Sequence, residues 1–220
     1  MKRNIITTAD GSKTIQIEEW NEQYHSKHGA VQEAYYVFIA HGLRLFKDTD
    51  LEILEVGFGT GLNAFITLLE STSQNLRVNY TGVEAFPVDF EEAMALNYIE
   101  ALGAQNYRAS FEKLHRSPWD KKINITEHFR LEKQKKDFKA INSSNLFNLI
   151  YYDAFGARVQ PELWTETLFL KMYNALKTKG VLVTYSAKGS VRRALQQVGF
   201  VVERLPGPPG KREMLRAIKP

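Results

Sequence analysis

One stretch decides the fold of this 220-residue chain: LEILEVGFGTGLN, residues 51–63. A short apolar run passes through the acid Glu55, three glycines follow at every second position, and an apolar helical periodicity begins at Leu62. The run is too short for a helix, and the glycines interrupt it. We therefore predict a buried strand, a tight turn and the start of a helix, with glycines that let a ligand approach the bare backbone.

The spacing of the glycines indicates the class of ligand. A dinucleotide fingerprint would need glycine at position 62, which is Leu62, and a P-loop would need a lysine followed by serine or threonine. The pattern present, Glu55-x-Gly57-x-Gly59-x-Gly61, resembles the cofactor loop of class I S-adenosylmethionine-dependent methyltransferases. A carboxylate there would repel a pyrophosphate but suits a ligand that carries an ammonium and a sulfonium. The alternative is a glycine-rich turn without a ligand.

Composition limits the class of protein. The length suits one domain with a short appendage, and no apolar run is long enough to cross a bilayer. The first residues lack the apolar core of a signal peptide, and the absence of cysteine excludes disulfides, thiolate metal sites and cysteine nucleophiles. His25 and His28 lie three apart without a third ligand nearby. We expect a cytoplasmic protein that needs neither a metal nor a membrane.

Charge is unevenly distributed along the chain. Residues 177–220 hold ten Lys or Arg against two acids, whereas residues 1–176 hold nineteen against twenty-three. A basic end on an otherwise acidic chain suggests a polyanionic partner such as nucleic acid. The alternative is a basic face that is merely solvated.

The remaining periodicities predict an N-terminal extension, residues 1–47, packed on a core domain, residues 48–220. The extension is expected to contain a hairpin around Asp10-Gly11 and a helix over residues 32–46. In the core we predict strands at residues 51–56, 78–84, 123–133, 146–152, 181–185, 199–205 and 214–218. Helices are predicted at residues 62–69, 90–102, 163–176 and 189–198. This order is typical of an α/β, doubly wound, Rossmann-like sheet that is mostly parallel with an antiparallel final strand.

Acids that follow predicted strands are the candidate site residues. Glu84 ends the second strand, where a doubly wound fold places the carboxylate that accepts hydrogen bonds from ribose hydroxyls. Asp153 ends a fully apolar strand and should therefore face the methyl donor and its acceptor. Asp137, in the third crossover loop, could bond the adenine amine. The alternatives are a chance strand-end glutamate, a turn-capping aspartate and an exposed loop acid, respectively.

Further segments make the resemblance more specific. They are Glu33, Val37-Phe38, Gly199-Phe200 and residues 57–63, 84–87, 152–155, 161–165, 185–189, 191–195 and 207–214. With these segments the chain resembles the tRNA 5-methylaminomethyl-2-thiouridine methyltransferases, known as the N-terminal domain of a bifunctional bacterial enzyme and as stand-alone proteins. The chain departs from that family's pattern in two places: Lys136 stands before Asp137 where a glycine is expected, and residues 156–158, Gly-Ala-Arg, replace an alanine-proline turn.

The resemblance implies a cofactor and a substrate. S-adenosylmethionine would be held by Glu55, Gly57, Gly59, Gly61, Asn63, Glu84 and Asp137. The aminomethyl uridine and the anticodon loop of tRNA would be held by Glu33, Tyr152, Phe155, Lys188, Arg192, Arg193, Lys211 and Arg212. Asp153 would orient the amine and take up its proton, while Tyr152 and Phe155 would wall the pocket and stack on the base. Ordinary core packing is the alternative for Tyr152.

The family's bifunctional form also carries a flavin oxidoreductase, and we find no second glycine fingerprint that would build one here. We therefore expect an aminomethyl group made elsewhere, with a separate flavin oxidoreductase as a candidate partner. Two competing hypotheses remain: a class I methyltransferase for a small molecule or a protein, and a non-catalytic RNA-binding module.

Overall fold

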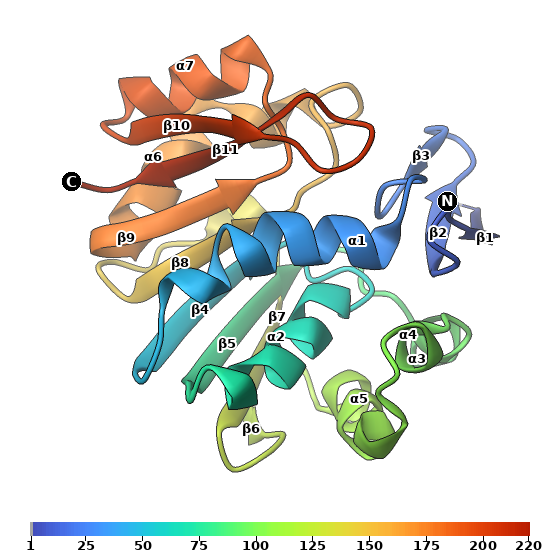
Figure 1. The fold of residues 1–220 in the computed structure, drawn as a ribbon. Helices are drawn as coiled ribbons and strands as arrows, with labels where there is room; N and C mark the ends of the chain where they lie inside the picture. Colours follow the sequence, from blue (N-terminus) through green and yellow to red (C-terminus); the bar gives the residue numbers. More distant parts are fainter. Residues whose placement is uncertain (1) are drawn as a thin grey trace.

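The computed structural model describes residues 2–220 and contains two sheets (Figure 1). The large sheet has eight strands in the order β10-β11-β9-β8-β4-β5-β7-β6. Its strands are β4 (Asp50–Val56), β5 (Arg77–Glu84), β6 (Lys122–Asn124), β7 (Phe129–Lys135), β8 (Phe147–Tyr152), β9 (Leu176–Thr184), β10 (Val201–Pro206) and β11 (Glu213–Ile218). The small sheet is antiparallel and consists of β1 (Arg3–Thr7), β2 (Lys13–Ile17) and β3 (Glu22–Gln23).

The centre of the large sheet is parallel. Strand β4 pairs in parallel with β5 and β8, β5 pairs in parallel with β7, and β8 with β9. Strand β11 is antiparallel to both β9 and β10, and the short edge strand β6 is antiparallel to β7. The predicted mostly parallel α/β sheet with an antiparallel final strand is confirmed, and the antiparallel edge strand β6 is an addition to it.

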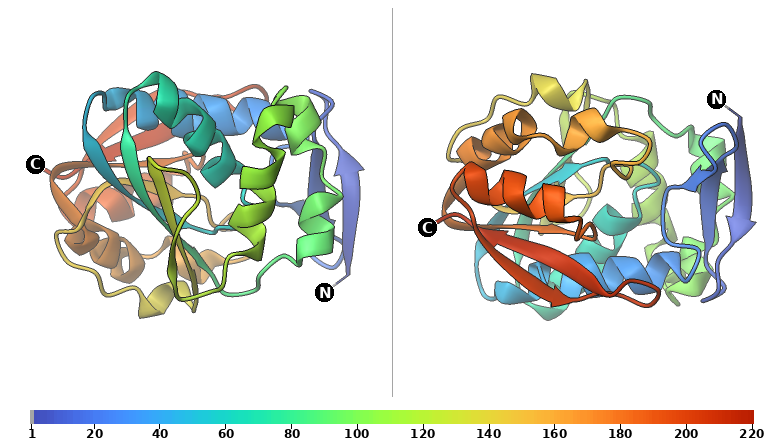
Figure 2. Two further views of the ribbon diagram at one scale, coloured as in Figure 1. Left: turned by 90° about the horizontal axis from the view of Figure 1, so that it is seen from below. Right: turned by 90° about the horizontal axis from the view of Figure 1, so that it is seen from above.

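Helices cover both faces of the large sheet (Figure 2). The helical segments are α1 (Ala30–Ala34), η1 (Tyr35–Ala40), η2 (Leu43–Leu45), α2 (Leu62–Ser73), α3 (Phe90–Met94), α4 (Tyr98–Ala101), η3 (Gln105–Tyr107), α5 (Arg108–Arg116), η4 (Phe138–Ala140), η5 (Pro161–Trp164), α6 (Glu166–Ala175) and α7 (Gly189–Gln197). One core joins the sheet to α1, η1, α2, α4 and α5, and the other joins it to α6 and α7.

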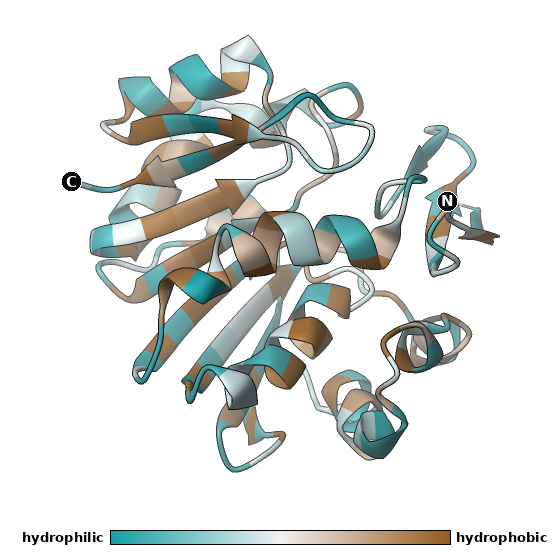
Figure 3. Ribbon diagram, in the orientation of Figure 1, coloured by the Kyte–Doolittle hydropathy of each residue, from teal (hydrophilic) through white to brown (hydrophobic). Residues whose placement is uncertain are grey.

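Successive residues of each central strand alternate between these two cores, as the period of a strand requires. In β8, Leu149 and Tyr151 belong to the first core, whereas Ile150 and Tyr152 belong to the second. Both faces of the central strands are therefore buried, which explains why these strands are nearly continuous apolar runs in the sequence. Figure 3 shows this concentration of hydrophobic residues along the central strands.

The small sheet docks against the carboxyl-terminal side of the large one through specific polar contacts. The guanidinium of Arg3 donates to the Glu92 carboxylate at 2.8 Å, and Arg158 donates to Glu22 at 2.9 Å and to the Trp20 carbonyl at 2.9 Å. Arg158 stands in the turn whose sequence departs from the family pattern. A few short strands are marginal alone, so these contacts help hold the small sheet in place.

Several predicted elements differ in the structure. The helix predicted over residues 32–46 is divided into α1, η1 and η2, and the helix predicted over residues 163–176 is divided between η5 and α6. The helix predicted over residues 90–102 is divided into α3 and α4, because the side chain of Asn97 between them accepts from the backbone of Lys13 and donates to the Gly11 carbonyl. The strand predicted over residues 123–133 is divided into β6 and β7. Strand β9 begins at Leu176 rather than at residue 181, because Leu176 pairs with Phe147 of β8 across a register shift. The domain boundary at residues 47 and 48 stays a prediction.

Candidate active site

A cavity of about 360 Å³ lies at the carboxyl ends of β4, β5 and β8. Six predicted site residues line it: Gly57, Gly59, Glu84, Asp137, Asp153 and Phe155. The N-terminal extension contributes Arg3, Trp20 and Tyr24 to the same walls, so the small sheet closes one side of the cavity. The structure thus brings together residues that follow three different strands, which is where open α/β sheets bind their ligands.

The glycine loop between β4 and α2 needs glycine at two of its positions for identifiable reasons. Gly57 has φ 98°, and a Cβ there would lie 2.6 Å from the carbonyl oxygen of Asp153. Gly59 has φ 49°, and a Cβ there would lie 3.0 Å from the ring of Tyr24. Both positions therefore combine left-handed backbone with close approach to a neighbouring segment, and larger side chains would push the loop away from the cavity.

Glu84 is fixed at the end of β5 by the backbone of two loops. Its Oε2 accepts from the amide of Gly59 at 3.0 Å, and its Oε1 accepts from the amide of Phe86 at 2.9 Å. Each carboxylate oxygen has a second lone pair, and the residue lines the cavity while only 8% exposed. Glu84 is thus oriented to accept hydrogen bonds from a ligand.

Two further residues line the same part of the cavity. Phe86, 58% exposed, offers an apolar ring to a ligand. Asp137 caps η4 by accepting from the amide of Lys139 at 2.7 Å, which occupies part of its hydrogen-bonding capacity. An adenine contact by Asp137 stays a prediction.

Three acids, Glu33, Glu55 and Asp153, form what we call the carboxylate cluster. Both amide protons of Asn63 are used within it: Nδ2 donates to Glu55 at 2.9 Å and to Asp153 at 2.8 Å. Glu55 is 1% exposed, and this burial raises its pKa well above the ordinary value, against the opposing effect of the Asn63 hydrogen bond. Glu55, Gly61 and Asn63 do not line the cavity, and Asn63 joins the Glu55 carboxylate to that of Asp153. A cofactor contact by these three residues stays a prediction.

Asp153 has the properties of a base near neutral pH. Burial, and secondly the charge of Glu33, raises its pKa to about 7, while the Asn63 hydrogen bond and the charge of Lys211 oppose the rise. The side chain is half-buried and faces the cavity. Such a carboxyl can be deprotonated at neutral pH and still have appreciable affinity for a proton.

A second depression, which we call the basic groove, has a volume of about 550 Å³ and is lined by residues 185–188, Arg204 and residues 211–213. Tyr185 links it to the cavity, because its hydroxyl donates to the carbonyl of Ala154 at 2.8 Å. The predicted RNA contacts Lys188, Lys211 and Arg212 all line the groove. Arg192 and Arg193 lie in the first turns of α7, next to the groove but outside its lining.

The two predicted aromatic contacts have different surroundings. Phe155 lines the cavity and meets Trp20 and Tyr24 edge to face, with ring centroids 5.4 and 4.9 Å apart. Tyr152 is fully buried against α6 and donates its hydroxyl proton to the carbonyl of Leu163. The predicted pocket role of Tyr152 is therefore wrong, because successive residues of β8 face opposite sides of the sheet and this one faces the helices.

Sequence reasoning missed Arg3, Trp20 and Tyr24. The only signal was the presence of two aromatics, Trp20 and Tyr24, in an otherwise polar segment, and nothing local related that segment to the strand ends. Within residues 2–220 no group of three or more metal-ligating side chains is close enough to hold a metal ion. No helix in the described part of the chain is long and apolar enough to cross a membrane.

Comparison with known proteins identifies the family. Residues 97–220 match the model of a family described as S-adenosyl-L-methionine-dependent methyltransferase. The chain belongs to this family. The methyltransferase prediction from the glycine loop and the strand-end acids is thereby confirmed.

Curated relatives and a solved structure extend this finding. The chain is 30% identical over 237 residues to the tRNA 5-methylaminomethyl-2-thiouridine biosynthesis bifunctional protein MnmC of Actinobacillus pleuropneumoniae, covering 92% of this chain and 33% of that protein. The chain is 29% identical over 213 residues to the protein of the same name from Hydrogenovibrio crunogenus, and this match covers 89% of this chain and 31% of that protein. This chain thus spans about a third of the length of these relatives.

The structure of MNMC2 from Aquifex aeolicus is similar with a TM-score of 0.78 at 29% identity, covering 98% of this chain and 69% of that one. A spermidine synthase bound to a transition-state analogue shares the fold alone, with a TM-score of 0.62 at 16% identity. The match covers 99% of this chain and 70% of that one. The resemblance drawn from the sequence motifs is confirmed by these comparisons.

The cavity fits the cofactor of this family. Its volume lies within the range of small-molecule sites, Gly57 and Gly59 of the glycine loop line it without side chains, and Glu84 offers carboxylate acceptors to a ligand. Phe86 supplies an apolar surface for a purine. S-adenosylmethionine is thus the cofactor that these residues would hold.

Proposed function

We propose that this protein methylates the nitrogen of the 5-aminomethyl group on the wobble uridine of tRNA, with or without a 2-thio group, in the cytoplasm. The product would be 5-methylaminomethyl uridine or its 2-thio form. The printed names of the curated relatives support the RNA and the modification. The observation that carries the proposal is that Asp153 faces the same cavity as the glycine loop and Glu84, with the basic groove immediately beside it.

The chemistry of the site suits an amine. When bound, S-adenosylmethionine would supply an electrophilic methyl carbon on a sulfonium sulfur, with S-adenosylhomocysteine as the leaving group, and an amine has the lone pair to attack that carbon only in its unprotonated form. A primary aminomethyl group is largely protonated at neutral pH, so it must lose a proton before the nitrogen–carbon bond forms. Asp153, with a pKa of about 7, can accept that proton.

The groove suits the rest of the RNA. Lys188, Arg192, Arg193 and Arg212 would bind phosphates of the anticodon loop, whose charge dominates affinity. Phe155, partly exposed in the cavity wall, would stack on the base, as aromatics do with bases splayed out of single-stranded RNA. A separate flavin oxidoreductase is proposed as the source of the aminomethyl group.

The test is methylation of tRNA that carries the aminomethyl group, followed by mass spectrometry of its nucleosides. We expect one added methyl on the wobble nucleoside, and none on tRNA that lacks the aminomethyl group. Methylation of free polyamines or of protein in place of tRNA would favour the competing methyltransferase hypothesis. Failure to bind S-adenosylmethionine in a calorimetric titration would favour a non-catalytic RNA-binding module.

A further inference from the structure

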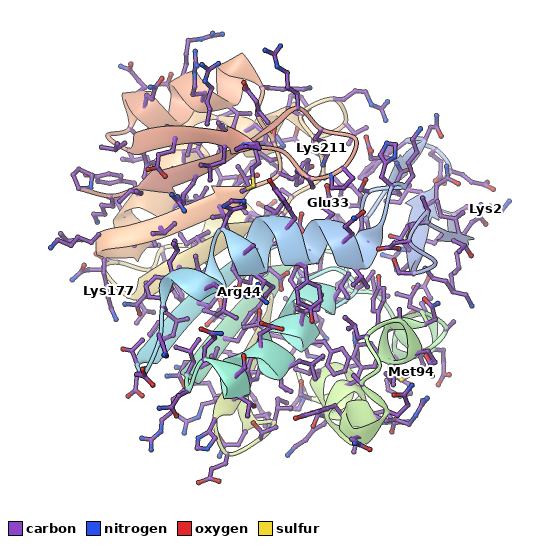
Figure 4. All side chains as sticks on the ribbon, in the orientation of Figure 1. Lys2, Glu33, Arg44, Met94, Lys177 and Lys211 are labelled. Carbon is purple, nitrogen blue, oxygen red and sulfur yellow. The ribbon has the colours of Figure 1, made fainter. Side chains whose placement is uncertain are left out.

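Lys211 differs from the other cations of the basic groove because it points into the carboxylate cluster. Its Nζ lies 2.5 Å from Oε1 of Glu33 and 3.8 Å from the centroid of the Tyr185 ring. Figure 4 shows Lys211 and Glu33 directed toward one another, from the loop between β10 and β11 and from α1. The ammonium is thus engaged on the protein side of the groove, whereas a phosphate would approach from the solvent side.

Glu33 is held rigidly for this contact. It is 7% exposed, and its second oxygen, Oε2, accepts from the amide of Ser26 at 2.8 Å. A buried carboxylate is costly without a partner. If Lys211 turned outward to bind a phosphate, Glu33 would lose the ion pair that balances its charge. The geometry therefore opposes the phosphate-binding role that the sequence predicted for Lys211.

Tyr185 connects this ion pair to the segment that carries Asp153: its ring lies under the Lys211 ammonium, and its hydroxyl donates to the carbonyl of Ala154, the residue after Asp153. Glu33 from α1 raises the pKa of Asp153, and Lys211 from the β10–β11 loop lowers it. Other titratable side chains that interact electrostatically with Asp153 are Glu55 from β4, Tyr80 from β5, Tyr98 from α4 and Tyr185, which directly follows β9. Burial favours the neutral form of all four, so Glu33 is the carboxylate whose charge Lys211 offsets near Asp153.

We propose that Lys211 is a positioning residue for methyl transfer: by pairing with Glu33 it lets Asp153 remain a carboxylate beside a second carboxylate, ready to accept a proton from the substrate amine. This inference rests on the function proposed above, and it removes Lys211 from the set of RNA-phosphate contacts. It also accounts for the position of Lys211 at the junction of groove and cavity, where the substrate amine would enter.

Three variants distinguish a positioning role of Lys211 from a role in binding RNA phosphates. Lys211→Met removes the charge and keeps the length of the side chain, Lys211→Arg keeps the charge, and Lys188→Met removes an exposed groove lysine as a matched control. For wild type we expect kcat/KM to rise with pH through about 7, as Asp153 deprotonates. For Lys211→Met this rise should move up by about half a pH unit or more, because a nearby positive charge favours the carboxylate.

The size of the defect should then depend on pH. At pH 7 Lys211→Met should lose roughly two- to tenfold in kcat/KM, and at pH 9 most of the loss should disappear. Lys211→Arg should keep the wild-type profile. Lys188→Met should keep the profile too, but weaken tRNA binding and flatten its salt dependence.

A measurement without substrate makes the inference independent of the proposed function. The pKa of Asp153 can be read by carbon-13 NMR of the labelled carboxyl in wild type and in Lys211→Met, and we expect a higher value in the variant. Equal values, or a salt dependence of tRNA binding that falls in Lys211→Met as it does in Lys188→Met, would overturn the positioning role. If wild type failed to methylate aminomethyl tRNA, the proposed function would fall while the NMR comparison still decided the effect of Lys211 on Asp153.

Discussion

The cavity and the basic groove are neighbours with opposite charge, and they differ in how firmly that charge is held. In the cavity, Glu84 and Asp153 each accept hydrogen bonds from fixed donors, and Glu84 is only 8% exposed. In the groove, Lys188 and Arg212 have no ion-pair partner among residues 2–220, and Lys188 is exposed. Surface charges act through long-range, screened attraction, whereas buried ones act through defined hydrogen bonds.

From this difference we expect the cavity to determine the rate of methyl transfer and the affinity for the cofactor, and the groove to determine the affinity for tRNA. Substitutions in the cavity should change rates or cofactor affinity by large factors that salt does not restore. Substitutions around the groove should change tRNA affinity by smaller factors that depend strongly on salt.

The largest effect is expected at Asp153. Asp153→Ala should reduce methyl transfer by two or more orders of magnitude, because the substrate ammonium loses its proton acceptor. Cofactor binding should be retained, since the glycine loop and Glu84 are unchanged. Initial rates with aminomethyl tRNA and a calorimetric titration with S-adenosylmethionine measure the two quantities. Near-normal turnover in this variant would remove the catalytic role of Asp153.

Glu84 should come next, with an effect on cofactor affinity. Glu84→Ala removes acceptors for ligand hydroxyls and also frees the amides of Gly59 and Phe86. Hydrogen bonds to a charged group contribute roughly 1.5–3 kcal/mol, so the Kd for S-adenosylmethionine should rise about ten- to a hundredfold. Glu84→Gln, which keeps one acceptor oxygen, should lose less. An unchanged Kd in Glu84→Ala would show that the ribose is held elsewhere.

A smaller, salt-dependent effect is expected at α7. Arg192→Ala/Arg193→Ala should weaken tRNA binding by about tenfold at low salt and reduce the slope of log affinity against log salt by ~1.4, for two contacts to a single strand. The matched control is Lys121→Ala/Lys122→Ala, which removes two exposed lysines at the opposite edge of the sheet. Binding that stays the same at matched salt, or falls equally in both double variants, would argue against a contact at α7.

The smallest functional effect is expected at Tyr152. Tyr152→Phe leaves the buried carbonyl of Leu163 without its donor, so the free energy of unfolding should fall by about 1–2 kcal/mol. The rate of methyl transfer should stay near that of wild type, because the ring faces α6 rather than the cavity. Thermal unfolding and initial rates measure the two effects. A large loss of rate with unchanged stability would restore Tyr152 to the substrate pocket.

Much of the fold was predictable because its signals are local. The glycine loop, the apolar strands and the acids that follow them are adjacent in sequence, and parallel strands bring their carboxyl ends to one edge of the sheet. Glu84 and Asp153 could therefore be placed near each other without a structure. The division of the helix at residues 90–102 could not be predicted, because its cause is the contact of Asn97 with the distant Gly11 and Lys13.

In the candidate site, too, some features follow from local sequence and others depend on contacts between distant segments. The sequence by itself determined the nucleotide-binding loop, the strand-end carboxylates and the excess of positive charge in residues 177–220, since each depends on residue type and short spacing. Only the tertiary structure decided that Tyr152 is core, that Asn63 bridges Glu55 and Asp153, and that Lys211 pairs with Glu33. These are contacts between segments up to 178 residues apart, and no local pattern encodes which side chain meets which partner once the sheet has formed.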